Sequence, residues 1–467
     1  MGFQLPPAVA SFLTLALIVF LFQRDIREKP DVSSALWLPL VWLVISCSRG
    51  LSQWLNIFGL PVAGAPSLEE GSPLDACFFF VLIAAGFYVL NKRRVRLSEI
   101  VRNNGWLIAF LLYCFISITW SDFPFVAFKR WIKILGHPIM ALIVLTEPDP
   151  QEAVIRLMKR CAYVVVPVSI LFIKFYPQWG RDFDPWGGGA SNNGIAGNKN
   201  MLGVDCLILG FFFLWYFLQM WRTERHTWRR RELWLAAWFL IGIWWLFSEA
   251  HSATALISLF IGVLTVVFVG SRFVNKNFIG AYLLAALVLL AATEVAFGIL
   301  GDLSESLGRG SEISGRTLLW TRLLELHTNP ILGTGFESFW LGRRPQQLEG
   351  LFYFIPNEAH NGYLEIYLTL GLIGLFILVA LFIATFWKIR PELWRNFEWG
   401  RFRLGLLAAI VIYNWTEAGF KTVHPIWFVF YIIAMDYPKL EYESVESCAV
   451  LEEDAELTHP QWEEIQR

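Results

Sequence analysis

Apolar runs long enough to cross a bilayer recur along the whole chain, separated by short polar segments. Because roughly 20 apolar residues span the hydrocarbon core, these runs predict an all-α polytopic membrane protein with about 13 transmembrane helices. The expected spans lie near residues 7–22, 35–48, 75–91, 105–120, 126–146, 161–176, 201–221, 233–248, 253–270, 278–300, 362–387, 404–417 and 424–437.

The first apolar run, residues 7–22, is interpreted as a retained span rather than a signal peptide. It has no basic segment before it and no small-residue cleavage site after it. The chain is 56% hydrophobic, which together with the recurring runs excludes a soluble globular protein. No internal repeat of the kind found in inverted-repeat transporters is evident.

The distribution of Lys and Arg predicts the orientation of these spans. Most of the 38 Lys and Arg residues fall in alternate loops, and positively charged loops remain on the cytoplasmic side. The N-terminus and the loops 177–200 and 301–361 are therefore expected outside, and the C-terminus inside. Residues 1–437 would form a single transmembrane domain, and 438–467 an acidic cytoplasmic tail.

Charge and cysteine content narrow the chemistry further. The formal net charge of −1 gives no indication of nucleic-acid binding, and no nucleic-acid partner is expected. The six cysteines show neither metal-ligand spacing nor a disulfide framework. We therefore expect neither a cofactor nor a metal.

A polar cluster around His360 leads directly into the long apolar run that starts at residue 362. Polar groups held at the mouth of a membrane span are costly and often functional. Imidazole suits proton transfer near neutral pH, which makes His360 the candidate catalytic residue. The alternative is an interfacial histidine that is hydrogen-bonded to a neighbouring loop.

The loop 301–361 is expected to carry a short amphipathic helix on the outer membrane face. Apolar residues recur at helical spacing over Thr317–His327, and Asn329 and Pro330 end the pattern. Arg316 would lie at the start of this helix, where a guanidinium and backbone N–H groups suit phosphate binding. The alternative is that Arg316 reaches toward lipid headgroups.

Other cations outside the cytoplasmic loops are candidates for substrate binding. Lys129 and Arg130 lie in the expected span 126–146, and three cations there are costly unless they face a cavity or an anion; a partly interfacial segment is the alternative. Arg181 and Lys199 belong to the glycine-rich, aromatic loop 177–200, which could stack on sugars or anchor the interface.

Glu417 and Lys421 flank the external turn between the last two expected spans. A structural Glu417–Lys421 ion pair is the favoured interpretation of this spacing. Glu417 is also retained as a candidate substrate-binding residue.

Several motifs together resemble the O-antigen ligase and polysaccharide polymerase family of bacterial inner-membrane proteins. His360–Glu365 followed by Gly371–Leu375 is similar to the family signature. Ser314–Trp320 and Asn329–Gly335 resemble its external-loop motif, and Gly197–Gly203 resembles its entry into a middle span. With Phe128–Arg130 included, the motifs look closest to the exopolysaccharide-production polymerase branch.

This resemblance implies a twelve-helix core, to which the first span is an addition. It also implies substrates carried on undecaprenyl diphosphate, no metal, a diphosphate-binding role for Arg316 and catalysis by His360. One departure concerns a Ser-Arg pair that many family members carry where this chain reads Ser252-Ala253-Thr254. Candidates to replace that arginine are Lys129, Arg130, Lys199 and His251.

The expected reaction is glycosyl transfer at the periplasmic face, from a polyprenyl-diphosphate-linked saccharide to a saccharide acceptor, in contact with membrane lipids and other polysaccharide export proteins. A polymerase would lengthen lipid-linked repeats, whereas a ligase would transfer the glycan to a lipid or protein acceptor. A transporter or flippase of an anionic lipid or solute, and a non-catalytic scaffold of an export complex, are the remaining alternatives.

Overall fold

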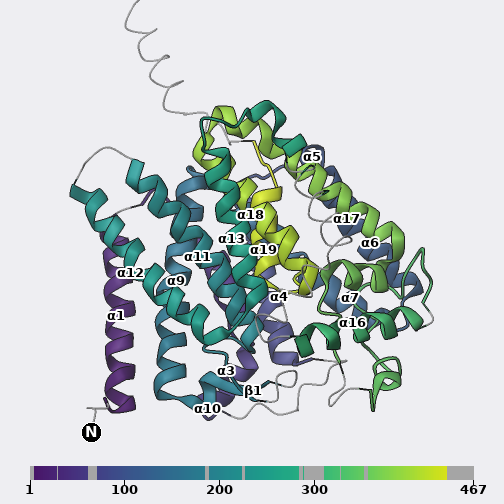
Figure 1. The fold of residues 1–467 in the computed structure, drawn as a ribbon. Coiled ribbons are helices and arrows are strands. Elements are labelled where there is room, and N and C mark those ends of the chain that lie inside the picture. Colours follow the sequence, from purple (N-terminus) through teal and green to yellow (C-terminus); the bar gives the residue numbers. More distant parts are fainter. Residues whose placement is uncertain are drawn as a thin grey trace, which may run out of the picture.

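The computed structural model describes residues 5–28, 30–60, 71–184, 189–222, 227–282, 285, 288, 310–326, 328–351 and 356–438. Its helices run side by side in a bundle (Figure 1), and the described residues contain one small antiparallel hairpin. The helices are α1 (Pro7–Arg27), η1 (Ser34–Leu36), α2 (Trp37–Ser46), α3 (Leu51–Ile57), α4 (Pro73–Lys92), α5 (Leu97–Asn103), α6 (Gly105–Ile116), η2 (Ser117–Trp120), α7 (Pro124–Ile134), α8 (Gly136–Leu145), α9 (Pro150–Phe175), α10 (Pro177–Gly180), α11 (Lys199–Arg222), α12 (Thr227–Ala250), α13 (Ala253–Val269), η3 (Lys276–Phe278), α16 (Gly310–Glu325), η4 (Pro345–Leu348), α17 (Gly362–Arg395), α18 (Phe397–Thr416) and α19 (Pro425–Ala434); the hairpin is β1 (Arg181–Asp184) and β2 (Gly189–Asn192).

The expected all-α polytopic membrane architecture is confirmed. Within the described residues, 5 helices are long and apolar enough to cross a membrane, or up to 7 if each of two bent helix pairs counts as one span. These helices are α1, α4, α11, α12 and α17. The expected total of about 13 spans stays a prediction.

Several expected spans differ in detail from the helices that form. The span expected at 126–146 is divided into α7 and α8, which meet at Leu135. Helix α9 begins at Pro150, well before the expected start at 161, because Asp149 caps its first backbone N–H groups. The span expected at 278–300 lies mostly outside the described residues.

The centre of the bundle is formed by helices that are apolar on every side. All ten residues of α19 and nine of the ten residues of α8 are buried. A helix that is hydrophobic all round belongs in the interior of a large protein. Each helix has 10 residues, which is too short to cross a bilayer on its own.

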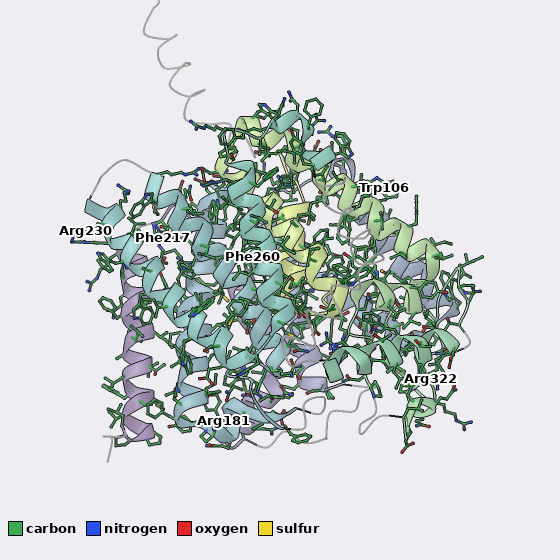
Figure 2. All side chains as sticks on the ribbon, in the orientation of Figure 1. Trp106, Arg181, Phe217, Arg230, Phe260 and Arg322 are labelled. Atoms are coloured by element: carbon green, nitrogen blue, oxygen red, sulfur yellow. The ribbon has the colours of Figure 1, made fainter. Side chains whose placement is uncertain are left out.

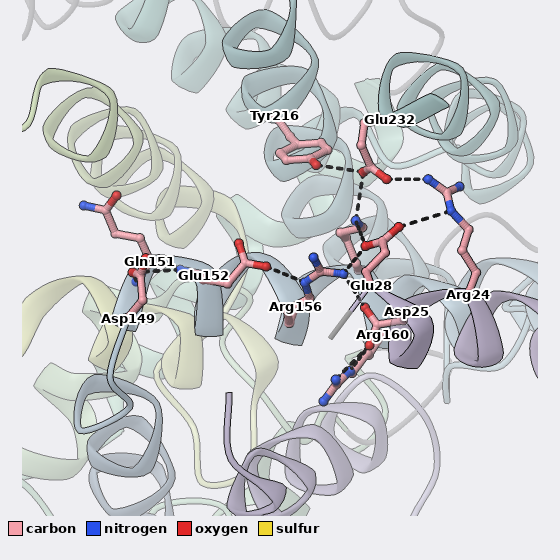
Figure 3. A network of polar contacts seen from close by, with 11 residues as sticks. Arg24, Asp25, Glu28, Asp149, Gln151, Glu152, Arg156, Arg160, Tyr216 and Glu232 are labelled. Atoms are coloured by element: carbon pink, nitrogen blue, oxygen red, sulfur yellow. Dashed lines mark hydrogen bonds and ion pairs between the residues drawn. The ribbon is translucent and has the colours of Figure 1, made fainter. Parts of the chain in front are cut away.

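A buried polar network holds α1 against its neighbours (Figure 3). The carboxylate of Asp25 accepts hydrogen bonds from Arg156 at 2.9 Å and Arg160 at 2.7 Å, both on α9. Glu232 on α12 accepts from Lys159 at 2.8 Å and also pairs with Arg24 of α1. Since each of these charged groups has a partner of opposite charge, the network joins α1 to α9 and α12.

The candidate external loops gather at one end of the molecule. Figure 1 shows α10, β1 and α16 toward the end where α1 begins. Arg181 and Arg322 are labelled at this end in Figure 2, whereas Arg230 lies at the opposite end. This common placement agrees with the expectation that the N-terminus and the loops 177–200 and 301–361 share one side.

Helix α17 is broken at Gly371, whose φ of 65° and ψ of −165° are not helical. The segment 329–335 lies along the break, where Leu372 N–H donates to the Pro330 carbonyl at 2.9 Å and Gly335 N–H to the Thr369 carbonyl at 2.8 Å. Irregular backbone at membrane depth needs such partners. The two glycine-containing motifs are therefore one structural unit, and this unit positions the start of α17.

Replacing Gly371 with alanine is expected to destabilise the protein. An added Cβ would lie 2.2 Å from the Ile331 carbonyl oxygen, and the backbone conformation is essentially restricted to glycine. The strain alone costs roughly 1–3 kcal/mol, which thermal unfolding of the detergent-solubilised protein would detect. Gly105→Ala is the matched control, because nothing lies within 4 Å of its added Cβ. Equal unfolding temperatures for the two variants would contradict the interpretation.

Candidate active site

The backbone at His360 is held in an uncommon conformation directly before α17. His360 has a φ of 48°, in the left-handed region that few non-glycine residues adopt. The next residue, Asn361, caps α17 by accepting hydrogen bonds from the N–H groups of Tyr363 and Leu364, both at 3.0 Å. The His360 side chain is buried, with 7% of the residue exposed.

Residues from three segments fix the backbone just before His360. Ala359 donates its N–H to a carboxylate oxygen of Glu365 at 3.1 Å, and its carbonyl accepts from the Trp320 indole of α16 at 2.7 Å. The other oxygen of Glu365 accepts from the Trp340 indole. Such surroundings maintain a strained conformation, as at many functional sites.

Two carboxylates lie beside the same ring nitrogen of His360. Its Nδ1 is 3.2 Å from Glu417 Oε2 and 3.4 Å from Glu358 Oε1. An ionised carboxylate only accepts hydrogen bonds, so Nδ1 carries the ring proton and donates a hydrogen bond to Glu417. In this tautomer Nε2 holds the lone pair, which is the arrangement that a general base requires.

Both carboxylates are kept ionised by neighbouring cations. Burial would raise the pKa of Glu417, but Arg316 and the hydrogen bond from His360 outweigh it and hold that pKa below its usual value. Burial likewise opposes ionisation of Glu358, yet Lys421 and His360 lower the pKa of Glu358 to about 2. The stabilisation from Glu358 is therefore present above pH 4.5 and is lost as the pH falls toward 2.

Arg316 lies against the end of α18, beside His360. It donates to the Thr416 carbonyl and to Glu417 Oε1, both at 2.8 Å. Two of the five guanidinium N–H groups are used in these contacts, so an anion could be bound without releasing Glu417. Arg316 falls within α16, because this helix begins at Gly310 rather than near residue 317 as expected.

The expected Glu417–Lys421 pair is wrong. Glu417 pairs with Arg316, and Lys421 pairs with Glu358. Glu417 directly follows the last residue of α18, and Lys421 lies four residues further on. Their spacing in the sequence did not show that each pairs with a residue far away in the chain. The result is a continuous row of alternating charges around His360.

The structure brings Arg130 close to this row through Glu337. Arg130 donates to the Glu337 carbonyl, and its Nε lies 3.9 Å from Glu337 Oε2. Glu337 Oε1 in turn accepts from the backbone N–H of Thr422 at 2.7 Å, one residue after Lys421. Lys129 lies on the same helix, α7, with its Nζ 5.0 Å from the Phe125 ring centre.

The remaining two candidate cations are placed differently. Arg181 donates to the Ile173 carbonyl of α9 at 3.2 Å and lies well apart from Arg322 of α16 in Figure 2. Lys199 starts α11, whose Gly203 packs closely against Ser252. Lys199 is therefore one helical turn along α11 from the residue that packs against Ser252, just before α13 begins.

The segment 252–254, where many members of the resembled family carry an arginine, adjoins the candidate site. The Thr254 hydroxyl lies 2.7 Å from the Thr416 hydroxyl, and Thr416 offers its carbonyl to Arg316. His251, just before this segment, has its Nδ1 2.9 Å from the Glu249 carbonyl and is exposed. Of the cations proposed as replacements, Lys199 lies on the helix that packs here.

The ligand atoms of Glu358, His360 and Glu417 lie within 4.8 Å of one another, which is a spacing that a metal ion could use. Lys421 and Arg316 already neutralise the two carboxylates. A divalent cation would have to compete with both, and this charge balance does not favour a metal.

Sequence reasoning assigned no role to Glu337 or Glu365. Glu365 stands inside the motif that follows His360, but nothing in the sequence shows that its carboxylate supports Ala359. Glu337 follows the motif 329–335 and has a φ of 48°, which sequence patterns do not reveal for a glutamate. The signal in both cases is an acidic residue at the edge of an apolar segment.

Comparison with known proteins supports the expected resemblance. Residues 236–379 match the family described as O-antigen ligase, and this segment contains Arg316, His360 and Glu365. The chain is also 26% identical over 301 residues to the exopolysaccharide production protein ExoQ of Rhizobium meliloti (strain 1021). That match covers 60% of this chain and 64% of the relative. The chain therefore spans less than two thirds of the relative's length. The similarity to the ligase and polymerase family, near its exopolysaccharide branch, is confirmed.

Proposed function

We propose that this protein lengthens lipid-linked saccharides at the periplasmic face of the bacterial inner membrane, as a polysaccharide polymerase. The observation that carries the proposal is the His360–Glu417–Arg316 arrangement, which sets a base beside a cation that can bind phosphate. The match to the O-antigen ligase family and the similarity to an exopolysaccharide production protein support the substrate class.

His360 is proposed to take the proton of the acceptor hydroxyl. Its Nδ1–H is held by Glu417, so Nε2 accepts the proton while the oxygen attacks the anomeric carbon of the donor. As the imidazolium forms, the negative charges of Glu417 and Glu358 stabilise it. Attack opposite the leaving group predicts inversion at the anomeric carbon.

Arg316 is proposed to stabilise the diphosphate that leaves. Charge develops on the leaving oxygen as the glycosidic bond to phosphate breaks, and a fixed cation in a water-poor site favours this change strongly. Lys199, at the start of the neighbouring α11, is proposed as the second cation for the donor. Arg130 contacts Glu337, and Lys129 is its neighbour on α7.

A ligase would use the same chemistry with a different acceptor. The polymerase and ligase hypotheses therefore differ in the product that accumulates when the enzyme is inactive. A transporter or a scaffold would not need the ordered His360 tautomer. The arrangement of two ionised carboxylates around one ring nitrogen is a specific observation in favour of an enzyme.

The test uses cells that lack this gene and are complemented with the wild type or with His360→Ala. We expect the variant to reach the membrane, to accumulate single repeats on the carrier and to form no long polymer. Polymer that forms but is not joined to its acceptor would instead favour the ligase, and normal polymer from the variant would favour transport or scaffolding.

Chelation of metals is expected to leave the rate of polymer formation unchanged. The carboxylates that could bind a metal are already paired with Lys421 and Arg316. The measurement is the rate of the purified protein before and after treatment with EDTA, with added Mg²⁺ as the control. A rate that falls with EDTA and returns with Mg²⁺ would contradict this part of the mechanism.

A further inference from the structure

A cavity of about 410 Å³ lies between α4 and α7. Three cations line it from α7, namely Lys129, Arg130 and Lys133, and all three are half-buried. Its volume falls in the range of small-molecule sites. The mechanism proposed above requires no cavity at this place.

The cations of this cavity are not fully balanced by acids. Lys129 and Lys133 are four residues apart on one helical face, where like charges destabilise the helix. Among the described residues, neither lysine forms an ion pair; instead Lys133 Nζ lies 5.8 Å from the Phe79 ring centre. An anion of high charge would relieve this repulsion.

The opposite wall of the cavity is apolar and open at the surface. Phe80 and Ile83 of α4 contribute to the lining, and Phe80 is 62% exposed. Phe87, two turns further along α4 and on the same helical face as Phe80, is exposed too. A ligand with a phosphate headgroup and a long hydrocarbon chain matches a cationic wall beside an apolar, lipid-facing one.

The cavity is connected to His360 by a series of polar contacts. Arg130, in its lining, contacts Glu337, and Glu337 accepts two hydrogen bonds from Thr422. The adjacent Lys421 pairs with Glu358, which lies 3.4 Å from His360 Nδ1. His360 is therefore linked to Arg316 through Glu417, and to Arg130 of α7 through a longer series of contacts that begins at Glu358.

We propose that this cavity binds the diphosphate of a second lipid-linked saccharide, the acceptor. The proposal rests on the proposed function, since a polymerase joins two saccharides that are both carrier-linked. The acceptor oxygen bonds to the donor's anomeric carbon, whose bond to the diphosphate oxygen breaks. The proton moves to His360, and the donor carrier leaves as polyprenyl diphosphate. The acceptor's own diphosphate stays intact. The cations of the cavity therefore bind and position the acceptor but take no part in breaking a bond.

The experiment counts the carrier lipids bound to the purified full-length protein by native mass spectrometry, with undecaprenyl diphosphate as the probe. We expect the wild type to bind two molecules. In Lys129→Gln/Lys133→Gln the affinity for one of them should fall about tenfold or more, while the other remains bound, which also shows that the variant is folded. Lys174→Gln is the matched control, because this exposed lysine lies outside the cavity and should leave both molecules bound.

Two outcomes would overturn the proposal. One is that the double variant binds both molecules as tightly as the wild type. The other is that phosphatidylglycerol displaces the probe equally well, which would identify the cavity as a site for bulk anionic lipid. The binding experiment needs no turnover, so it is independent of the test of the proposed function. A His360→Ala protein that still forms polymer would contradict the proposed function, whereas the number of bound carriers alone decides whether this cavity binds the acceptor.

Discussion

Replacement of His360 by alanine is expected to lower the rate of glycosyl transfer by roughly 10²- to 10⁴-fold. The imidazole is the base that the geometry provides, since Glu417 holds Nδ1–H and so directs Nε2 to the acceptor proton. The carboxylates nearby are ionised but are paired with cations, which makes them poor substitutes. The measurement is the initial rate at which the purified protein lengthens a lipid-linked saccharide.

His360→Asn separates the loss of the base from a disturbed backbone. Asparagine tolerates the left-handed conformation that His360 adopts, whereas alanine is strained there. We expect the asparagine variant to unfold at nearly the same temperature as the wild type and to be as inactive as the alanine variant. A rate within tenfold of the wild type would show that His360 is not the base.

Arg316→Ala is expected to reduce the rate by roughly 10²- to 10³-fold, the usual cost of removing a group that stabilises charge in the transition state. The change also leaves Glu417 buried without its principal cation, which raises the pKa of this carboxyl toward its usual value. The lost charge and the raised pKa of Glu417 both slow glycosyl transfer, because Glu417 orients His360 for that step. The measurement is again the initial rate, at saturating lipid-linked donor.

Arg322→Ala is the matched control for this change. Arg322 lies on the same helix, α16, but it is partly exposed and pairs with Glu325. Surface pairs of this kind contribute little, so the rate should stay near that of the wild type. Arg316→Lys should recover part of the lost activity, because it keeps the charge and loses the forked geometry. Equal losses in Arg316→Ala and Arg322→Ala would indicate a structural role for the whole helix.

The sequence predicted the class of the fold because apolar runs of span length are a strong signal, and α1, α4, α11, α12 and α17 follow it. It did not predict how the segment 126–146 divides. There the apolar pattern continues, but the helix is interrupted at Leu135, next to Gly136, where an added Cβ would lie 2.0 Å from the Trp42 ring. Packing against a distant helix decides such a break, and periodicity carries no information about it.

The candidate site could be predicted in part for a similar reason. His360 and Arg316 belong to motifs, so the family resemblance identified them, and the structure brings both to Glu417. The partners of Lys421 and Glu417 were misassigned, because they are set by tertiary contacts with residues 57 or more positions away. Arg181 was proposed from its loop composition, yet its contact is with the carbonyl of Ile173 on α9.

The most direct test of the central claim is to place the purified protein in vesicles with one defined undecaprenyl-diphosphate-linked repeat. The account predicts that longer lipid-linked saccharides appear and that one undecaprenyl diphosphate is released for each new glycosidic bond. It also predicts that His360→Asn yields neither product. If the wild type forms no longer saccharide and releases no diphosphate, or if the asparagine variant matches it, the account is contradicted.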